Sequence, residues 1–343
     1  MGTNKFIERT VIPDILKIVS FTKNLHYYSY AEHMSEEFFP QSGYKYKVIV
    51  DLKSESYFKH LLKKVPSPTT LQYSNIVYLL ARTKNNIELL YTQRLYPYGR
   101  LWAHITEGKD RLMFYINPLY FYGIRLRIEN ILPPGIHLRN LTYLMLLKNG
   151  ILSLYASSFA LNEKEGCLIL SPPNVGKSVT VSNAAQDGMF YLSEDISIVK
   201  NGYIYSVPYT NTYSHRLSKM KYLGPISYFF PSTTPFSSKF KDNILPKSRL
   251  KYIFILEPSS TNEITTIPLE VAIRKIQLLN EIEFNYHCDR IILSRFYLLN
   301  EDISDTKKIE RDIIEKIIKQ ANIFLVKAKN PQHYYQLIKS VII

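Results

Sequence analysis

The residues best suited to a chemical role lie in one loop, Ser171-Pro172-Pro173-Asn174-Val175-Gly176-Lys177-Ser178, followed by Val179. The end of this loop matches the pattern G-x-x-x-x-G-K-[ST], in which backbone N–H groups at a helix N-terminus bind phosphate oxygens. In such loops the lysine contacts the outer phosphates and the hydroxyl that follows it binds Mg²⁺. We therefore predict that residues 171–179 bind a nucleoside triphosphate, with Lys177 on the phosphates and Ser178 on the metal.

The segments around the loop are those that the motif requires. The apolar run Cys167–Leu170 before it predicts a buried strand. Lys177–Gln186 after it lacks glycine and proline and predicts a helix that stops at Asp187-Gly188. One departure is Ser171, which stands where the pattern has its first glycine, a position that often needs permissive backbone angles.

A GTPase is an alternative interpretation of this loop, because Pro173–Ser178 is also typical of translation-type GTPases. Those proteins need Asp-x-x-Gly for the switch and Asn/Thr-Lys-x-Asp for guanine. Neither pattern occurs anywhere in the 343 residues. The sequence therefore disfavours a GTPase.

An acidic pair, Glu194-Asp195, follows the apolar run Met189–Leu192. Phosphoryl transfer needs charge neutralisation and one carboxylate beside the attacking hydroxyl. Adjacent residues on a strand point to opposite faces, so we expect one carboxylate to reach the site unless a strand end or bulge intervenes. A solvated pair of turn residues is the alternative interpretation.

The stretch from about 140 to 208 resembles the HPr serine kinase/phosphorylase family and its stand-alone relatives. Leu154-Tyr155-Ala156-Ser157 stands where that family has Leu-His-Ala-Ser, and Leu192-Ser193-Glu194-Asp195 stands where it has Ser-Asp-Asp or Ala-Asp-Asp. The loop lies between them at the family's usual distance, and weaker similarity continues through Leu250–Pro258. Tyr155 replaces the family's histidine and Glu194 its first aspartate.

The resemblance implies a mixed, β-rich α/β fold with a P-loop core like that of phosphoenolpyruvate carboxykinases. It also implies ATP, Mg²⁺ and phosphoryl transfer to a hydroxyl. Carried over by position, Lys177 holds the outer phosphates, Asp195 is the general base, and Ser178 and Glu194 lie at the metal. From its place in a polar loop, Arg216 is a further candidate to meet a phosphate, with a surface arginine as the alternative.

The rest of the chain divides at Pro133-Pro134-Gly135. We predict a mixed, β-rich N-terminal module over 1–135 and an HPr kinase-like ATP-binding domain over 136–343. Residues 1–45 show only a weak helical pattern. In the second domain, two separate apolar runs, Ile151–Leu154 and Ser158–Leu161, precede the loop at 171–176. The expected strands of the module are Tyr46–Leu52, Asn75–Ala81, Ile87–Gln93, Arg100–Ile105 and Arg111–Ile116.

Composition limits the remaining choices. No run of 18 apolar residues occurs, so we expect no membrane span. The two cysteines, Cys167 and Cys288, predict reduced thiols and a cytoplasmic protein. The net charge of +14 suits an anionic partner or a lysine-rich soluble surface.

These observations predict an ATP-dependent kinase that phosphorylates a serine or similar hydroxyl, in a peptide such as a biosynthetic precursor peptide or in a protein. The departures at Ser171, Tyr155 and Glu194 leave open a nucleotide-binding regulatory or scaffold protein with weakened or no catalysis. A free-serine kinase and a nucleic-acid-binding ATPase are further alternatives, although we do not expect nucleic acid as the partner. A homo-oligomer is compatible with the sequence.

Overall fold

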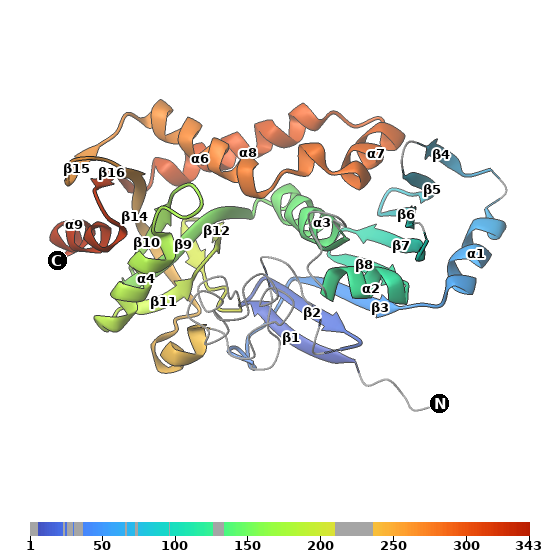
Figure 1. The fold of residues 1–343 in the computed structure, drawn as a ribbon, viewed down its shortest axis with the longest axis horizontal. Helices are drawn as coiled ribbons and strands as arrows, with labels where there is room; N and C mark the ends of the chain where they lie inside the picture. The colour runs from blue at the N-terminus through green and yellow to red at the C-terminus, as the bar shows by residue number, and fades with distance from the viewer. Residues whose placement is uncertain are drawn as a thin grey trace. The chain divides into compact units, whose positions relative to one another are not determined.

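The computed structural model describes residues 6–22, 25, 30, 37–65, 67–72, 75–95, 97–125, 134–209 and 236–343. Contacts divide the chain into two compact units (Figure 1). Unit 1 comprises 1–28, 32–145 and 285–305, and unit 2 comprises 29–31, 146–284 and 306–343. Within the described residues each unit is built on an eight-stranded sheet, which confirms a mixed, β-rich α/β protein.

The sheet of unit 1 has the strand order β1-β2-β3-β8-β7-β6-β5-β4. β2, β3 and β8 run parallel to one another, and the strands from β8 to β4 form an antiparallel meander. Its strands are β1 (Ile7–Ile12), β2 (Leu16–Ser20), β3 (Tyr46–Leu52), β4 (Thr69–Gln72), β5 (Ile76–Arg82), β6 (Asn86–Leu95), β7 (Gly99–Gly108) and β8 (Arg111–Ile116).

The predicted strands Tyr46–Leu52 and Arg111–Ile116 are confirmed with unchanged bounds as β3 and β8. The weak helical pattern of residues 1–45 was misleading, because β1 and β2 form there. β2 is buried on both faces except at Lys17, so it lacks the alternation of polar and apolar residues by which a strand is usually recognised.

The helices of unit 1 include a segment from the C-terminal half of the chain. They are α1 (Glu55–Lys64), α2 (Pro118–Arg125), α3 (Pro134–Lys148, which ends in unit 2), the 3₁₀ turn η3 (Tyr286–Cys288) and α7 (Arg290–Leu299). Asp289 caps α7, because its Oδ1 accepts hydrogen bonds from the backbone N–H groups of Ile291 (2.9 Å) and Ile292 (3.3 Å). Its Oδ2 accepts from Asn140 Nδ2 of α3 at 3.0 Å, which ties α7 to α3.

Arg295 of α7 attaches the same segment to the sheet of unit 1. The side chain is 1% exposed, and its Nε donates to both carboxylate oxygens of Glu107 on β7 at 2.7 and 2.8 Å. Its Nη1 donates to Glu301 at 2.7 Å. A buried arginine that is satisfied by two carboxylates fixes residues 285–305 on unit 1.

We expect His137 of α3 to make the stability of the fold depend on pH. Burial lowers the pKa of His137 below its ordinary value of 6.5, and nearby Asp289 opposes this only in part. Burial lowers the pKa of His104 on β7 in the same way, against the opposing charge of Glu88. Below pH 6.5 the unfolded chain therefore binds more protons than the native chain, and the free energy of unfolding falls as pH decreases.

We expect urea unfolding of the wild type to show this loss between about pH 7.5 and about pH 5.5, at up to about 1.4 kcal/mol per pH unit for each such histidine. His137→Gln keeps a group that can accept from Tyr120, which lies 2.9 Å from His137 Nδ1. On unfolding, that variant should take up about one proton fewer than the wild type. Its free energy of unfolding should therefore depend less steeply on pH. An unchanged slope in His137→Gln would show that His137 is not the titrating group.

The sheet of unit 2 has the order β10-β9-β12-β13-β14-β16-β15, with β11 also paired to β9. β10 pairs with β14 as well as with β9, so β9, β12, β13, β14 and β10 close into a ring. Its strands are β9 (Leu152–Asn162), β10 (Glu165–Leu170), β11 (Phe190–Ser193), β12 (Ile196–Lys200), β13 (Tyr203–Tyr205), β14 (Lys247–Pro258), β15 (Glu263–Thr266) and β16 (Asn322–Ala328).

β9 is one strand, where the sequence predicted two separate runs. Every residue from 152 to 160 is buried. Its first half pairs with β12 and its second half with β11, so the strand has neighbours over its whole length. The residues between the two runs, Tyr155, Ala156 and Ser157, therefore do not interrupt the strand.

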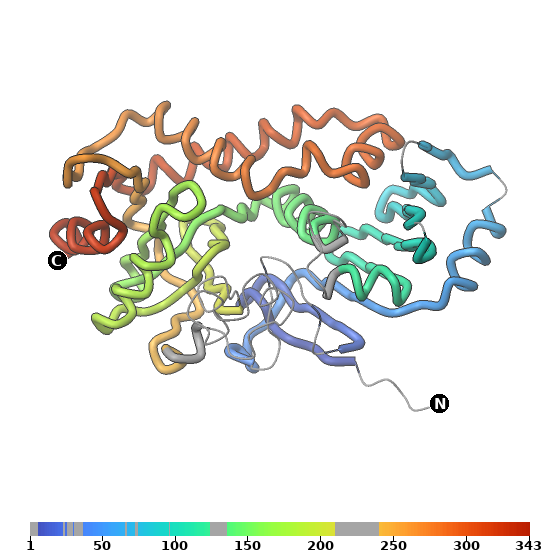
Figure 2. Tube along the Cα trace, viewed as in Figure 1, coloured from blue at the N-terminus to red at the C-terminus, as the bar shows by residue number. Residues whose placement is uncertain are grey.

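The helices of unit 2 pack on this sheet. They are α4 (Lys177–Gln186), the 3₁₀ segment η2 (Phe236–Asn243), α6 (Leu269–Glu283), α8 (Ile303–Ile318, which begins in unit 1) and α9 (Pro331–Ile342). α9 lies beside α4 (Figure 2), where Tyr335 OH and Lys339 Nζ donate to Asp187 Oδ2 at 2.8 and 2.7 Å. In the part of the chain that the structure describes, no helix has the length and apolar character to cross a membrane.

Candidate phosphate-binding site

The loop at 171–176 joins a buried strand to a helix, as the motif requires. β10 is buried from Gly166 to its end at Leu170, and α4 begins at Lys177, which confirms the predicted strand and helix. Between them Pro172, Pro173 and Asn174 are exposed. The loop backbone is therefore held at both ends and open to solvent in its middle.

Two loop residues have positive φ. They are Asn174 (φ 65°) and Gly176 (φ 138°). Asparagine is one of the few residues that visit the left-handed region readily, whereas φ near 138° is open in practice to glycine alone. Ser171 is not among the described residues with positive φ, so this backbone does not require glycine at the first position of the motif.

The N-terminus of α4 faces the loop without a side-chain cap. Gly176 is the N-cap residue and has no side chain to supply one. The first N–H groups of a helix have no partner within the helix and carry a partial positive charge. An anion can take the place of the missing cap, and this property fits the phosphates predicted at 171–179.

Lys177 is the first residue of α4, directly after the loop, and is 6% exposed. Its Nζ donates to the backbone oxygen of Ser171 at 2.8 Å. It also lies 3.6 Å from the centroid of the Tyr155 ring, on β9. The ammonium is thus placed beside the first residue of the loop and on the face of an aromatic ring.

The strand register brings the acidic pair to the same level of the sheet as the loop. β10 and β12 flank β9 on opposite sides, with Leu170 opposite Ala156 and Ile196 opposite Tyr155. The loop begins directly after Leu170 and Glu194-Asp195 directly precede Ile196. Two strand spacings separate the two backbones by roughly 10 Å.

Glu194 and Asp195 form a bend between β11 and β12, not part of a strand, so strand alternation does not fix their directions. Glu194 is 1% exposed and Asp195 is half-buried. The Ser157 hydroxyl donates to the backbone oxygen of Glu194, which holds the bend against β9. The roles of both carboxylates, and of Ser178 as a metal ligand, stay predictions.

A buried cluster of three serines, which the sequence reasoning missed, supports this bend. The hydroxyls of Ser158 and Ser197 each lie 2.6 Å from that of Ser193 and 2.9 Å from one another. Ser197 also donates to the backbone oxygen of Ala156. The cluster lies where β9 changes partner from β12 to β11, and its sequence signal is serine inside otherwise apolar strands.

Asn280 of α6 is a second missed residue. Its Oδ1 accepts from the backbone N–H of Tyr155 at 2.9 Å, and its Nδ2 donates to the backbone oxygen of Ser153 (3.0 Å) and to Glu310 of α8 (2.9 Å). Asn280 is 1% exposed and Glu310 is 4% exposed. A single polar residue on the otherwise apolar buried face of α6 is the signal that would have indicated it.

Arg216 lies outside the described residues, as does the remainder of 210–235. Among the residues that are described, no group of three or more His, Cys, Asp or Glu side chains could hold a metal ion. Mg²⁺ is commonly held by one or two carboxylates together with substrate phosphates and water. Ser178 and Glu194 are a donor set of that kind, and Mg²⁺ binding stays a prediction.

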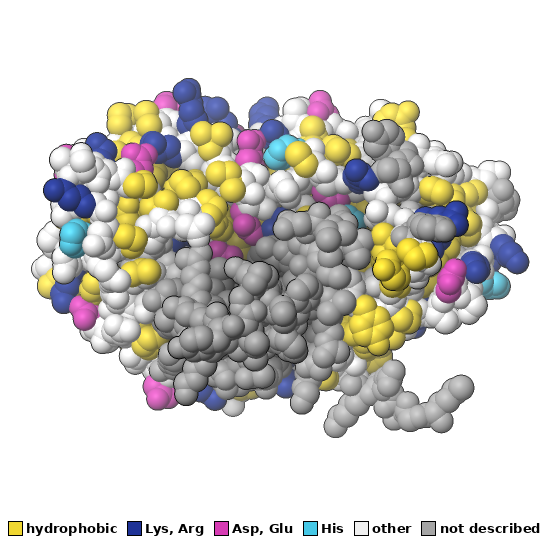
Figure 3. All heavy atoms as spheres, in the orientation of Figure 1, with side chains coloured by type: hydrophobic (Ala, Val, Ile, Leu, Met, Phe, Trp, Pro, Cys, Tyr) yellow, Lys and Arg dark blue, Asp and Glu magenta, His cyan; other side chains and the backbone are white. Residues whose placement is uncertain are grey.

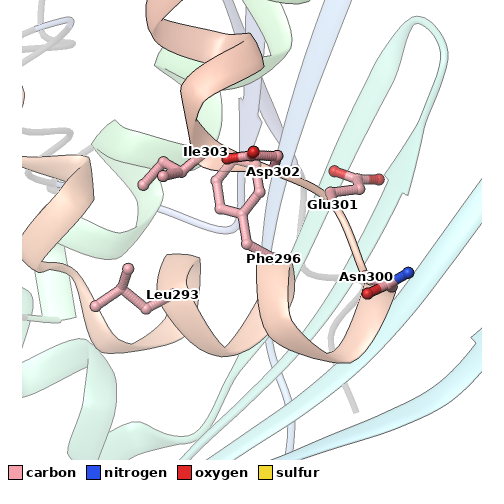
Figure 4. A pocket seen from close by; sticks show the side chains of 6 residues that line it. All are labelled: Leu293, Phe296, Asn300, Glu301, Asp302 and Ile303. Atoms are coloured by element: carbon pink, nitrogen blue, oxygen red, sulfur yellow. The ribbon is translucent and has the colours of Figure 1, made fainter.

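A shallow pocket of about 360 Å³ lies between α7 and the start of α8, in unit 1 (Figure 4). It is lined by Leu293, Phe296, Asn300, Glu301, Asp302 and Ile303. Its two carboxylates would repel phosphates, and both are engaged: Glu301 accepts from Arg295, and Asp302 accepts from the backbone N–H of Ser304. The lining of this pocket therefore does not suit a phosphate group.

Comparison with known proteins gives structural likenesses that are distant. No family model matches the chain, and no curated protein matches it. A solved structure of the HPr(Ser) kinase/phosphatase from Coxiella burnetii is similar over 55% of this chain and 95% of that chain, with a TM-score of 0.26 and 11% identity. A likeness this weak does not establish family membership, which stays a prediction.

Proposed function

We propose that this chain binds ATP with Mg²⁺ through residues 171–179 and transfers the terminal phosphate to a hydroxyl. The observation that carries the proposal is the position of Lys177, at an uncapped helix N-terminus that the loop 171–176 joins to a buried strand. The acidic bend at 194–195 lies at the same level of the sheet, which supports a transfer reaction over binding alone.

The proposed roles follow from the chemistry of each group. Lys177 and the N–H groups of the first turn of α4 neutralise the phosphates. Ser178 and Glu194 would hold Mg²⁺, which would supply further charge neutralisation. Asp195 accepts the proton of the acceptor hydroxyl, as the less buried of the two acids. Arg216 is retained as a second cation for the phosphates.

The proposed acceptor is a serine in a peptide, such as a biosynthetic precursor, or in a protein. β4 ends the sheet order of unit 1, and three of its four residues are exposed. An edge strand of this kind can pair with an extended peptide. Free serine is the alternative acceptor.

We expect Asp195→Asn to slow phosphate transfer by a factor of about 10² to 10⁴, the usual contribution of a general base. The measurement is transfer from γ-labelled ATP with Mg²⁺ to peptide, protein and free-serine pools, read by mass spectrometry. Asp312→Asn, on the exposed face of α8, is the matched control and should transfer at the wild-type rate.

Two outcomes would change the proposal. ATP binding without transfer to any pool would favour the regulatory or scaffold alternative, which the replacement of the family's histidine by Tyr155 also favours. Hydrolysis stimulated by nucleic acid, with steep salt dependence, would favour the nucleic-acid-binding ATPase.

In the view of Figure 3, the Lys and Arg side chains of the described surface are spread around the molecule and do not gather into one patch.

A further inference from the structure

The contact between Lys177 and Tyr155 affects the affinity of the loop for a nucleotide. This inference rests on the proposed function, in which residues 171–179 bind ATP. The Lys177 Nζ lies 3.6 Å from the Tyr155 ring centroid, a close cation–π contact. Both residues are nearly covered, at 6% and 7% exposure. A cation–π contact that is shielded from water is stronger than one at the surface.

Of the two partners, Tyr155 is the fixed one. Its backbone N–H donates to Asn280, and β9 is paired on both sides at this level, with Ile196 opposite Tyr155 and Leu170 opposite Ala156. Lys177 carries its charge on a flexible four-carbon stem. When the contact breaks, the lysine moves and the ring stays.

The surroundings of the ammonium leave little room for phosphate oxygens. One side faces the Tyr155 ring and another donates to the Ser171 carbonyl, and the small exposure of Lys177 shows that other atoms cover most of the remainder. The exposed part of the loop is Pro172–Asn174. Phosphates that enter at this open part can reach the ammonium only if the lysine turns out toward them.

We propose that Tyr155 is a positioning residue that holds Lys177 in a withdrawn state, so that a nucleoside triphosphate must draw the ammonium off the ring in order to bind. The ring competes with the phosphates for the same charge. It therefore lowers the affinity for the nucleotide and raises the nucleotide concentration at which the site fills.

The test is MgATP affinity, measured by isothermal titration calorimetry on the full chain. Tyr155→Leu removes the ring face and keeps an apolar side chain, so binding should tighten by about 5-fold to 30-fold, the equivalent of a partly desolvated cation–π contact. Tyr155→Phe keeps the ring face and should bind like the wild type. A purely structural role for Tyr155 predicts the opposite sign, because loss of packing would weaken binding.

A matched control and a graded series complete the experiment. Tyr205→Leu is the control, since Lys247 lies over its ring at 5.6 Å and Lys247 begins β14 at the end opposite to the loop. Should Tyr155→Leu fail to fold, phenylalanines with increasing fluorination at position 155 weaken the negative electrostatic potential of the ring face and nearly keep its shape. Affinity for MgATP should then rise with each added fluorine.

The outcomes separate this inference from the proposed function. If the wild type binds MgATP and Tyr155→Leu or the fluorinated series binds equally or more weakly, the withdrawn-lysine inference is overturned and the proposed function stands. If neither the wild type nor any variant binds MgATP, the proposed function fails and takes the inference with it.

Discussion

Gly176→Ala is expected to weaken MgATP binding at least about 30-fold and to lower the melting temperature, because position 176 combines backbone strain with a steric conflict. Its φ of 138° lies where L-residues are rarely found. A Cβ there would lie 3.1 Å from Pro331 Cβ and 3.2 Å from Tyr334 Cδ2. Tyr334 is 1% exposed in the core between α4, α9 and the sheet, so its side chain cannot shift without a large energetic cost.

The loop or the start of α9 must therefore shift, and the N–H groups at the start of α4 move with the loop. Gly188→Ala is the matched control at the other end of α4. Gly188 also has positive φ, at 85°, but nothing lies within 4 Å of its added Cβ. Equal MgATP affinity in the two variants would mean that the geometry at 176 does not matter for binding.

Asn280→Ala is expected to destabilise the protein by about 2–4 kcal/mol, because it removes a buried side chain that makes three hydrogen bonds. The Tyr155 N–H, the Ser153 carbonyl and Glu310 all lose this partner in a place that water does not reach. The loss should appear as a lower urea midpoint with an unchanged slope.

The control for Asn280→Ala is Leu278→Ala on the same helix, where the side chain is 53% exposed. It should change stability by less than about 0.5 kcal/mol. A double-mutant cycle with Glu310→Gln measures how much of the Asn280 effect passes through that carboxylate. If Asn280→Ala is as mild as Leu278→Ala, the network around β9 does not support the site as described.

Local patterns were enough to predict the elements next to the loop. The four-residue apolar run before Ser171 and the stretch without glycine or proline after Gly176 are signals within a few residues, and both appear in the fold as β10 and α4. The turn Asn201-Gly202, which joins β12 to β13, is a signal of the same local kind.

The contacts that shape the site were not predictable in this way, because they join residues far apart in the chain. Asn280 meets Tyr155 across 125 positions, and the Tyr155 ring covers Lys177 only because β9 and β10 pair in one register. Residues 285–305 pack with unit 1 through Arg295 and Asp289. No local pattern in the sequence indicates that the chain returns to unit 1 at this segment.

Ser171 shows the opposite case, in which a sequence pattern gave more doubt than the structure supports. A missing glycine suggests a damaged loop only when the backbone there needs positive φ. Ser171 does not have positive φ, whereas Asn174 and Gly176 do. The glycine that the geometry requires is the one that the sequence retains.

The measurement that most directly tests the central claim is MgATP binding by the wild type and by Lys177→Ala, compared by calorimetry with and without Mg²⁺. Lys164→Ala, an exposed lysine in the turn before β10, is the control. We expect saturable, Mg²⁺-dependent binding by the wild type and by Lys164→Ala, and an affinity for MgATP that is reduced at least about 10-fold in Lys177→Ala. Absence of binding by the folded wild type, or equal affinity in Lys177→Ala, would contradict it.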